Sequence, residues 1–541
     1  MNKISVRTLV VFGFCVIVSV PLILPYFKSG FFPTHDGEWA VVRLAEMYRE
    51  IKDFQFPARF SGYLNFEYGY PLFNFAYPMP YYFGLIFIFL KLGFVGSIKI
   101  LFASSVILSA FFMFLLSESL WKSKIAGIVS SVLYIYVPYR IVDLYVRGSL
   151  GESLSFVIFP LIILGILGLY RKSELKYVIF TGFMYGLLIM THNIMAVLFG
   201  VFIFFIFLYT IFIKNIKFAL NLFFSITISL AISAFFWIPA VFEKNLILLS
   251  KTPIANRSLH FIKPLDLIIP RWGYGVPNDT NGFSFQIGLP QLAVLLILFY
   301  FIVKNIKKID KNLLILVVSI VAFIALLFSP SAFIWENIPF LSEINYPWTI
   351  LGILMFLISL ASGFITKTGK VSTIVVLILA FISLILITPY AKPQSHIDRG
   401  DQFYLTNQAT TTSSTELMPL WVKEFPIQKT EKKVDLVDGE ISNISYNSKL
   451  ITFSVKMPED EIVRINRLYY PGWNVYVDGL RTKIDFNNKY GLMDIALGEG
   501  VHSVKAVFSE TPLRVFSNIV SLFSLITAGL ALAFFRNYKI K

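Results

Sequence analysis

The sequence predicts a polytopic α-helical membrane protein that carries a small β-domain outside the cytoplasm, near the C-terminus. Three observations predict this class. Apolar runs long enough to cross a bilayer recur from end to end of the 541 residues. The chain is 56% hydrophobic and only 15% charged, whereas a soluble protein has about 25% charged residues. The short gaps between the apolar runs are basic at every second position.

These basic gaps determine the predicted topology. Short cytoplasmic loops of membrane proteins carry an excess of Lys and Arg, because basic loops resist translocation. The gaps that alternate with these basic gaps along the chain are long, polar and mixed in charge, so we expect them outside the cytoplasm. The basic gaps contain Lys122 and Lys124; Arg171, Lys172 and Lys176; Lys214 and Lys217; Lys304, Lys307, Lys308 and Lys311; Lys367 and Lys370; and Arg536, Lys539 and Lys541.

The net charge of +15 lies largely in these gaps. It therefore indicates orientation and contact with anionic membrane lipids, not nucleic-acid binding. The single cysteine, Cys15, lies in the first apolar run, so no intrachain disulfide can form.

The first apolar run extends from about Leu9 to Phe27 and follows Lys3 and Arg7. It is longer than the apolar region of a secretory signal peptide, which has about 7–15 residues, and no small-x-small cleavage site follows it. We therefore predict an uncleaved first span with the N-terminus in the cytoplasm.

Segment 81–92 decides the parity of the topology. Its roughly 12 residues make a helix of about 18 Å, against a hydrocarbon core of about 30 Å, and Pro78 and Pro80 stand at its start. If it crossed the bilayer, every basic gap after it would lie outside the cytoplasm. We therefore expect it to dip in and return, or to lie along the interface.

The remaining apolar runs bring the total to about twelve spans, with both termini cytoplasmic. These spans are predicted at 97–117, 123–140, 152–170, 177–191, 194–213, 218–242, 289–304, 312–329, 347–366, 371–388 and 516–535. The predicted outside segments are 28–96, 141–151, 243–288, 330–346 and 390–515.

Segment 390–515 differs in composition from the membrane domain 1–389. Residues 390–433 are rich in Thr, Ser and Gln and predict a loosely ordered linker. Residues 434–515 contain period-two runs separated in part by Pro-Gly and Asp-Gly, which predict a small antiparallel β-domain. The last span and a basic cytoplasmic tail follow in 516–541. The alternating runs lie at 450–455, 462–465, 473–477 and 504–508.

The first outside loop opens with the cluster Thr34-His35-Asp36-Gly37-Glu38. A carboxylate just outside the first span lies at the membrane–water boundary, where burial can raise its pKa and nearby arginines can lower it. Asp36 could therefore take a proton from a sugar hydroxyl as a general base. Asp is also a favoured N-cap residue, so capping of a helix that begins near Glu38 is the alternative. The two roles are compatible.

The second outside loop holds Asp143, Arg147 and Glu152 among tyrosines and a further arginine. Tyr and Arg there are typical interfacial anchors, but carboxylates at the edge of an apolar core are costly and usually paired or functional. Asp143 and Arg147 have helical i,i+4 spacing and could form an ion pair. Structural and functional interpretations of this loop both stay open.

Other chemical signals in the sequence are weak. His192 lies in a turn between two spans and could face the same site, although a lone histidine in a turn is more often structural. No cluster has zinc-ligand spacing, and no phosphate-binding loop or dinucleotide motif occurs. The sequence therefore requires no cofactor. Asp36 and Asp143 could share a divalent cation, but nothing requires one.

The order of the parts resembles the GT-C class of integral-membrane glycosyltransferases, which use polyprenyl-phosphate sugars as donors. Three short motifs resemble a narrower branch, the bacterial and archaeal "6-pyruvoyl-tetrahydropterin synthase-related" membrane family. These motifs are His35-Asp36-Gly37, Tyr70-Pro71-Leu72-Phe73 and Arg147-Gly148-Ser149-Leu150-Gly151-Glu152. Segment 469–479 is similar to the tail of membrane proteins implicated in lipoteichoic-acid glycosylation. The family label names a soluble zinc enzyme, so we do not take it as an activity.

The resemblance implies a GT-C-like fold in a prokaryotic plasma membrane, and transfer of a sugar from a polyprenyl-phosphate donor to an envelope glycan or lipid. It matches Asp36, with His35 beside it, to the catalytic acid of the first loop. Asp143 or Glu152 matches the acid of the second loop. The motif is His-Asp-Gly-Glu, not the paired Asp-Glu of protein mannosyltransferases, so a protein acceptor is not supported.

Loop 243–288 lies where such enzymes hold a lid over the lipid carrier. Arginines and lysines there could bind the donor phosphate by charge-assisted hydrogen bonds. The candidate phosphate ligands are Arg257, Lys263 and Arg271 in this loop, with Arg59 and Arg147 elsewhere. The candidate substrate-binding residues are Glu38, Tyr70 and His192.

Two other functions fit a polytopic protein with outside domains. A flippase or transporter of lipid-linked glycans would also need many spans, but transporters usually have internal repeats and ionisable groups near the midplane. Here the charges cluster at one face and no repeat is found. A non-catalytic membrane protein of envelope assembly is the third interpretation.

Overall fold

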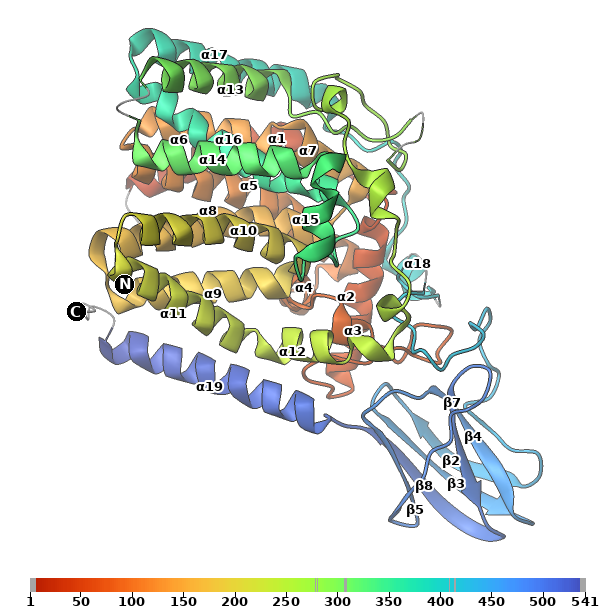
Figure 1. Cartoon of the computed structure of the whole chain (residues 1–541). Helices are drawn as coiled ribbons and strands as arrows, with labels where there is room; N and C mark the ends of the chain where they lie inside the picture. The colour runs from red at the N-terminus through yellow and green to blue at the C-terminus, as the bar shows by residue number, and fades with distance from the viewer. Residues whose placement is uncertain are drawn as a thin grey trace.

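The computed structural model describes residues 6–277, 279, 281–305, 309–407, 409–412 and 415–535. Lys307 and Lys308 of one predicted basic gap, and the predicted basic tail 536–541, lie outside the described residues. The described chain forms a bundle of roughly parallel helices with a β-sheet region against one end (Figure 1).

An α-helix occupies each of the twelve apolar runs within the described residues. Helices are expected there because a bilayer leaves no water to satisfy backbone polar groups. The helices are α1 (Val6–Ile23), α5 (Gly93–Trp121), α6 (Lys124–Ile135), α8 (Leu150–Lys172), α9 (Leu175–Thr191), α10 (Asn193–Phe212), α11 (Ile216–Ile232), α13 (Leu289–Lys304), α14 (Lys311–Leu326), α16 (Ile350–Ser362), α17 (Lys370–Ile387) and α19 (Pro512–Phe535).

Shorter helices connect and cover these. They are α2 (Gly37–Lys52), α3 (Leu72–Phe75), α4 (Met79–Phe89), α7 (Pro138–Val142), α12 (Ala234–Phe242), α15 (Ala332–Asn337) and α18 (Asp401–Leu405), with a π-helical turn at Asp143–Arg147. Turns of 3-10 helix lie at Leu24–Phe27, Lys244–Leu246, Leu248–Ser250, Arg257–His260, Pro264–Leu267, Ser329–Ser331, Pro347–Thr349, Gly363–Lys367 and Thr388–Tyr390.

The predicted number of twelve spans is not established. Seven described helical segments are long and apolar enough to cross a membrane, or up to ten if each of three bent pairs counts as one span. The sequence predicts one span over 218–242, but α11 and α12 are bent by 74° at Ser233. A bend of 95° separates α14 from the segment Ser329–Asn337, where Pro330 cannot donate a backbone hydrogen bond.

Helix α16 lies inside the bundle and α19 at its edge (Figure 1). Of the most apolar 18-residue stretch of α16 with its flanking turns, 89% of the residues are buried; in α19 the corresponding share is 6%. Phe356 of α16 packs edge-on against Phe159 and Phe199, at 5.8 and 5.7 Å between ring centroids. The apolar surface of α19 is therefore left for lipid to cover.

The described helix ends that border the predicted basic gaps gather at one end of the bundle (Figure 1). Arg171, at the end of α8, donates to the hydroxyl and carbonyl oxygens of Ser119 near the end of α5, at 2.8 and 2.7 Å. Lys367 lies over the ring of Trp121, at 5.7 Å from its centroid. The long loops, with α2, α3, α18 and the β-strands, gather at the opposite end (Figure 1). Which end faces the cytoplasm stays a prediction.

Helix α4, in the segment that decides parity, does not run the length of the bundle. Tyr81 in its first turn lies beside Asp36, at the end that carries α2. After α4 the chain enters α5, where the amides of Phe94 and Val95 donate to Asp401 at 2.8 Å each. Asp401 belongs to α18, which packs against α2. Both ends of α4 therefore lie at the same end of the bundle, as a non-crossing segment requires.

The C-terminal region contains two antiparallel sheets. Predicted strand runs 450–455, 462–465, 473–477 and 504–508 fall within four of the eight strands, and the predicted Asp-Gly turn joins β5 to β6. One sheet has the order β1 (Val434–Asp435), β4 (Glu461–Leu468), β7 (Leu492–Leu497); the other has the order β2 (Glu440–Tyr446), β3 (Leu450–Met457), β8 (Gly500–Phe508), β5 (Trp473–Val477), β6 (Leu480–Thr482).

The two sheets are attached to the first outside loop. Arg467 of β4 is buried and donates to the carbonyl oxygen of Gly62. The carboxylate of Asp53, at the end of α2, accepts from the amide of Ser448 at 2.8 Å. The β-sheet region is therefore held against the same loop that carries Asp36.

Candidate active site

Helix α2 begins at the acidic motif of the first outside loop. Asp36 occupies the N-cap position, but its carboxylate makes no capping hydrogen bond. The hydroxyl of Thr34 serves instead, accepting from the amide of Gly37 at 2.9 Å. The cap interpretation is therefore right for the position of Asp36 and wrong for its side chain. Within the described residues, the Asp36 carboxylate has no hydrogen bond or ion pair.

The second outside loop runs against this motif. The amide of Asp36 donates to the carbonyl oxygen of Arg147 at 2.8 Å. Gly148 follows with φ +63°, a left-handed conformation that glycine adopts without strain. A Cβ at Gly148 would overlap the hydroxyl of Thr34. Glycine at this position therefore allows the two loops to approach closely.

The segment predicted as a linker is the third component, and part of it is more ordered than predicted. Thr411 is fully buried. Its hydroxyl accepts from Nε of Arg43 at 3.0 Å and lies 3.0 Å from the phenolic oxygen of Tyr70, and its carbonyl accepts from the same guanidinium. Burial raises the pKa of Tyr70 to about 12, so this phenol stays neutral. Arg43 and Tyr70 therefore fasten the linker to α2.

A polar cavity of about 150 Å³ lies where these three segments meet. It presents two carboxylates, a guanidinium and two phenols within one small space, a set that can bind hydroxyl groups and accept a proton. Its walls are Asp36, Trp39, Ala40, Arg43, Tyr77, Tyr81, Gly148, Leu150, Thr412 and Glu416. Of the predicted site residues, only Asp36 lines this cavity.

The acids of the second loop lie apart from the cavity, in a buried network. The side chains of Asp143 and Glu152 are fully buried. Glu152 is ion-paired with Arg147 and accepts from the hydroxyl of Tyr139 at 2.7 Å. Asp143 lies 3.8 Å from Arg147 and 3.7 Å from Arg140. The predicted Asp143–Arg147 pair is present, and these charges compensate one another within the fold.

His35 and Glu38 contact neighbouring segments instead of lining the cavity. Nε2 of His35 lies 2.9 Å from the carbonyl oxygen of Tyr274, in the predicted lid loop. The carboxylate of Glu38 lies 3.5 Å from the guanidinium of Arg399 and 3.4 Å from the hydroxyl of Tyr404. The acidic motif is thus the point where the lid loop and the linker both attach.

His192 lies next to the cavity wall. It is 7% exposed, and its Nδ1 accepts from the amide of Met195 at 3.2 Å, which caps α10. Its ring packs on that of Tyr77, with 5.1 Å between centroids. His192 therefore supports a wall residue and does not itself line the cavity.

Three of the predicted phosphate ligands lie away from the cavity. Arg59 is buried and pairs with Glu510 at 3.3 Å, next to α19. Arg257 donates to two backbone carbonyls of the next outside loop. The side chain of Arg271 is 68% exposed and lies 3.6 Å from Asp266. Of the three, Arg271 alone presents its guanidinium to the outside of the fold.

The structure offers no cation site of the kind considered from the sequence. Within the described ranges, no group of three or more His, Cys, Asp or Glu side chains is placed to hold a metal ion. Asp143 is held between Arg140 and Arg147 and does not line the cavity with Asp36. The two carboxylates therefore do not form a shared site.

Several cavity residues were not singled out as site residues from the sequence. Trp39, Ala40 and Arg43 follow Asp36 at intervals of three, four and seven, so helical periodicity could have placed them on one face of α2. Tyr77 and Tyr81 also have i,i+4 spacing. Thr412 and Glu416 carried no local signal, because they reach the cavity through tertiary contacts of the linker.

Fold and site together describe an integral membrane protein with a polar cavity among the loops at one end of its helical bundle. No protein-family model matches the chain. Over 240 residues it is 23% identical to an uncharacterized protein of Lactococcus lactis subsp. cremoris strain MG1363, a match that covers 42% of this chain and 39% of that protein. The chain thus matches well under half the length of this relative.

Among solved structures, the chain is similar to the Archaeoglobus fulgidus oligosaccharyltransferase in its apo form, with 14% identity, 75% of this chain and 60% of that chain covered, and a TM-score of 0.43. It is similar to the same organism's AglB in complex with an inhibitory peptide and a dolichol-phosphate, with 15% identity, coverages of 75% and 56%, and a TM-score of 0.41. The mycobacterial arabinofuranosyltransferase AftD matches with 12% identity, coverages of 74% and 28%, and a TM-score of 0.41.

At this level of likeness the comparisons assign no activity to the chain. They also give no support to the pterin-synthase-related label or to the lipoteichoic-acid link.

Proposed function

We propose that the chain is a membrane glycosyltransferase, which moves a sugar from a polyprenyl-phosphate donor to an envelope glycan or lipid acceptor outside the cytoplasm. The observation that carries this proposal is the Asp36 carboxylate. It lines a polar cavity among the loops, and it is not used as a helix cap, because the Thr34 hydroxyl accepts the hydrogen bond from Gly37. A reactive carboxylate at the end of a bundle of apolar helices suits a substrate that is part lipid and part sugar.

In the proposed reaction, Asp36 takes the proton of an acceptor hydroxyl group. The acceptor oxygen then forms a bond to the anomeric carbon of the donor sugar, and the bond from that carbon to the phosphate oxygen breaks. Polyprenyl phosphate leaves with the electron pair. The cavity of about 150 Å³ is smaller than the roughly 300 Å³ at which ligand clefts begin. It would therefore enclose the reacting groups and leave the lipid and the rest of the acceptor outside.

The leaving phosphate needs a cation. Arg147 is already neutralised by Glu152, and two donors of Arg43 are held by Thr411. Arg271 on loop 243–288 is exposed, and its carboxylate neighbour is 3.6 Å away. We therefore assign the donor phosphate to Arg271, which would approach when the loop closes over the lipid carrier.

The test is mass spectrometry of envelope glycans from cells that make either the native protein or Asp36→Asn as the sole copy. We expect Asp36→Asn to be made at normal levels and to lose the transferred sugar. The matched control is Asp398→Asn, an exposed carboxylate outside the cavity, which should leave the glycans unchanged. Glycans that stay intact with Asp36→Asn would contradict the general-base role.

A flippase predicts a different result. Its loss would also deplete envelope glycans, but the purified protein in detergent would transfer no sugar, because a flippase forms no glycosidic bond. Transfer in detergent solution therefore separates the two functions.

A further inference from the structure

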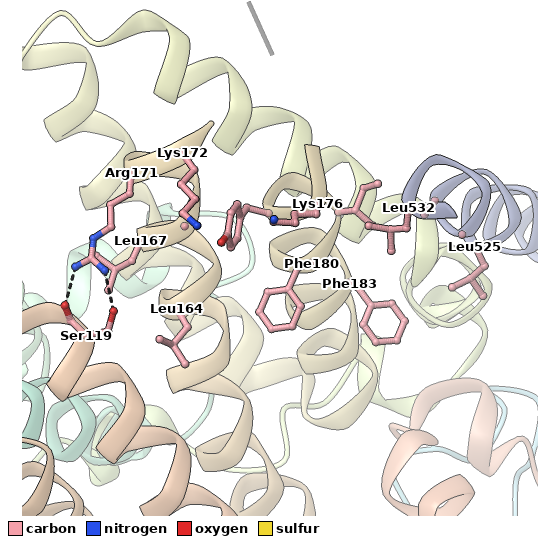
Figure 2. Close-up of a pocket in the computed structure, with 15 residues that line it drawn as sticks. Ser119, Leu164, Leu167, Arg171, Lys172, Lys176, Phe180, Phe183, Leu525 and Leu532 are labelled. Atoms are coloured by element: carbon pink, nitrogen blue, oxygen red, sulfur yellow. Dashed lines mark hydrogen bonds between the residues drawn. The ribbon is translucent and has the colours of Figure 1, made fainter. Parts of the chain in front are cut away.

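A second and larger cleft lies at the opposite end of the bundle from Asp36, between α8, α9 and α19. Its volume is about 800 Å³. Figure 2 shows Leu164 of α8, Phe180 and Phe183 of α9, and Leu525 and Leu532 of α19 around it. Most of its wall is apolar, and it does not touch the candidate active site.

Three basic side chains line one end of this cleft: Arg171, Lys172 and Lys176 (Figure 2). Among the described residues, Arg171 donates to the neutral oxygens of Ser119 and has no carboxylate partner. Lys172 is exposed and makes no ion pair within the described residues. Lys176 is paired with Glu174. Glu174 thus offsets one of these three positive charges, which leaves the rim positive.

Within the described residues, α19 is buried in its first half and lines the cleft with its second half. Its buried residues are Arg514, Ser517 and Ser521, all in its first half, where Arg514 binds the carboxylate of Glu243 at 2.7 Å. The second half contributes Leu525 and Leu532 to the cleft wall, and these are 42% and 36% exposed. An apolar wall without a protein partner needs an apolar occupant in a membrane.

We propose that this cleft binds an anionic glycerophospholipid. Its phosphate would lie against Arg171, Lys172 and Lys176, and an acyl chain would fill the space between α9 and the second half of α19. The charge complementarity of the rim selects an anionic head group, since each basic residue near an anionic lipid surface adds to binding. The apolar wall selects a lipid over a free phosphate. The lipid would complete the contact of α19, the helix that follows the β-sheet region, with the rest of the bundle.

The test measures binding of phosphatidylglycerol to the purified full-length chain in detergent by native mass spectrometry. Two further ligands serve as controls. Phosphatidylcholine lacks the anionic head group, and glycerol phosphate lacks the acyl chains. We expect retained phosphatidylglycerol and little retention of the other two. Equal retention of phosphatidylcholine would show ordinary lipid contact only, and equal retention of glycerol phosphate would show an anion site only; either result overturns the proposal.

Two variants separate the head-group and chain contacts. Lys172→Gln combined with Lys176→Gln should weaken phosphatidylglycerol binding by about tenfold or more. Lys214→Gln combined with Lys217→Gln removes the same charge from the next basic gap, outside the cleft, and should leave binding unchanged. Gly529 lines the cleft, and a Cβ there meets no atom within 4 Å. Gly529→Trp should therefore fold and block the acyl chain.

Unchanged affinity in the lysine double variant or in Gly529→Trp would overturn the assignment.

Discussion

At Asp36 two roles compete for one carboxylate. A residue at the start of a helix usually uses its side chain to cap free amides, but Thr34 already caps Gly37. The Asp36 side chain is therefore available to the cavity. The sequence could place Asp36 at the start of a helix, but it could not decide which of two neighbouring acceptors would serve as the cap.

Two other carboxylates of α2 are buried where the first outside loop meets the sheets. Glu46 accepts from the amide of Tyr63, and Glu50 accepts from the hydroxyl of Ser61, both at 2.8 Å. One oxygen of each carboxylate is buried without a hydrogen bond in the described part of the chain. Burial raises the pKa of Glu46 to about 7. Burial and the nearby charge of Glu46 raise the pKa of Glu50 well above its usual range.

This pKa shift makes a prediction for stability. The folded chain favours protonated Glu46. The stability that this preference gives to the folded chain is fully present below the ordinary pKa of 4.5 and is lost as the pH rises through about 7. Glu46→Gln mimics the protonated form and keeps the acceptor for Tyr63. We expect this variant to raise the free energy of unfolding of the purified chain near pH 8 by up to about 3 kcal/mol, measured as a higher melting temperature. Near pH 4 the melting temperature should change little.

The control for this prediction is Glu459→Gln, which alters an exposed carboxylate and should leave the melting temperature unchanged at both pH values. Destabilisation of Glu46→Gln near pH 8 would show that ionised Glu46 is favoured in the folded chain, contrary to the account.

At the scale of elements, the second outside loop shows what local spacing can and cannot predict. The i,i+4 spacing of Asp143 and Arg147 correctly predicts their pairing. The stronger partner of Arg147 is Glu152, which lies across the turn at Gly148. Gly148 in that turn lies so close to Thr34 of another loop that a Cβ there would overlap the threonine hydroxyl. Contacts between loops far apart in sequence carry no periodic signal, so they could not be predicted.

The lid loop contributes a kinetic prediction. Arg271 is exposed on this loop, and we assign it to the donor phosphate. Arg271→Ala should raise the apparent KM for the lipid donor far more than the KM for the acceptor. Arg271→Lys should recover only part of the loss, because lysine lacks the planar fork of the guanidinium. Initial rates over a range of each substrate measure both effects.

Lys251→Ala, on the same loop and also exposed, is the matched control and should behave like the native protein. If Arg271→Ala raised the KM for the acceptor alone, or changed neither KM, the phosphate role would be wrong and Arg271 would belong to a solvated rim.

At the scale of the whole molecule, apolar runs and lysine alternation predicted most of the bundle. Helices stand at each of the twelve runs, and the described helix ends beside the basic gaps gather at one end of the bundle, because both features follow from local composition. Two bends fall inside predicted spans, at Ser233 and between Ile135 and Pro138, and were not predicted, because the hydropathy of a segment does not show whether its helix changes direction. The ordered part of the linker around Thr411 was missed because a Thr/Ser-rich run is polar whether it is free or bound into a fold.

Orientation in the membrane can be tested with introduced cysteines in a Cys15→Ala background. Lys124→Cys and Lys217→Cys should be protected from a membrane-impermeant thiol reagent in intact cells, because basic gaps are predicted in the cytoplasm. Glu440→Cys, exposed on β2, should be labelled. The reverse pattern would show that the whole bundle is inverted, with the basic gaps outside the cytoplasm.

The central claim is that Asp36 acts as the base in transfer from a lipid-linked sugar. The most direct measurement is a single-turnover assay in detergent, in which purified chain, polyprenyl-phosphate sugar and envelope acceptor are mixed and released polyprenyl phosphate is followed by mass spectrometry. The native chain should release polyprenyl phosphate and form the glycosylated acceptor in equal amounts. Asp36→Asn should be slower by about 10²-fold or more, with unchanged melting temperature. Equal rates for the two proteins, or no transfer by the native chain with any lipid-linked sugar from its own membranes, would contradict the account.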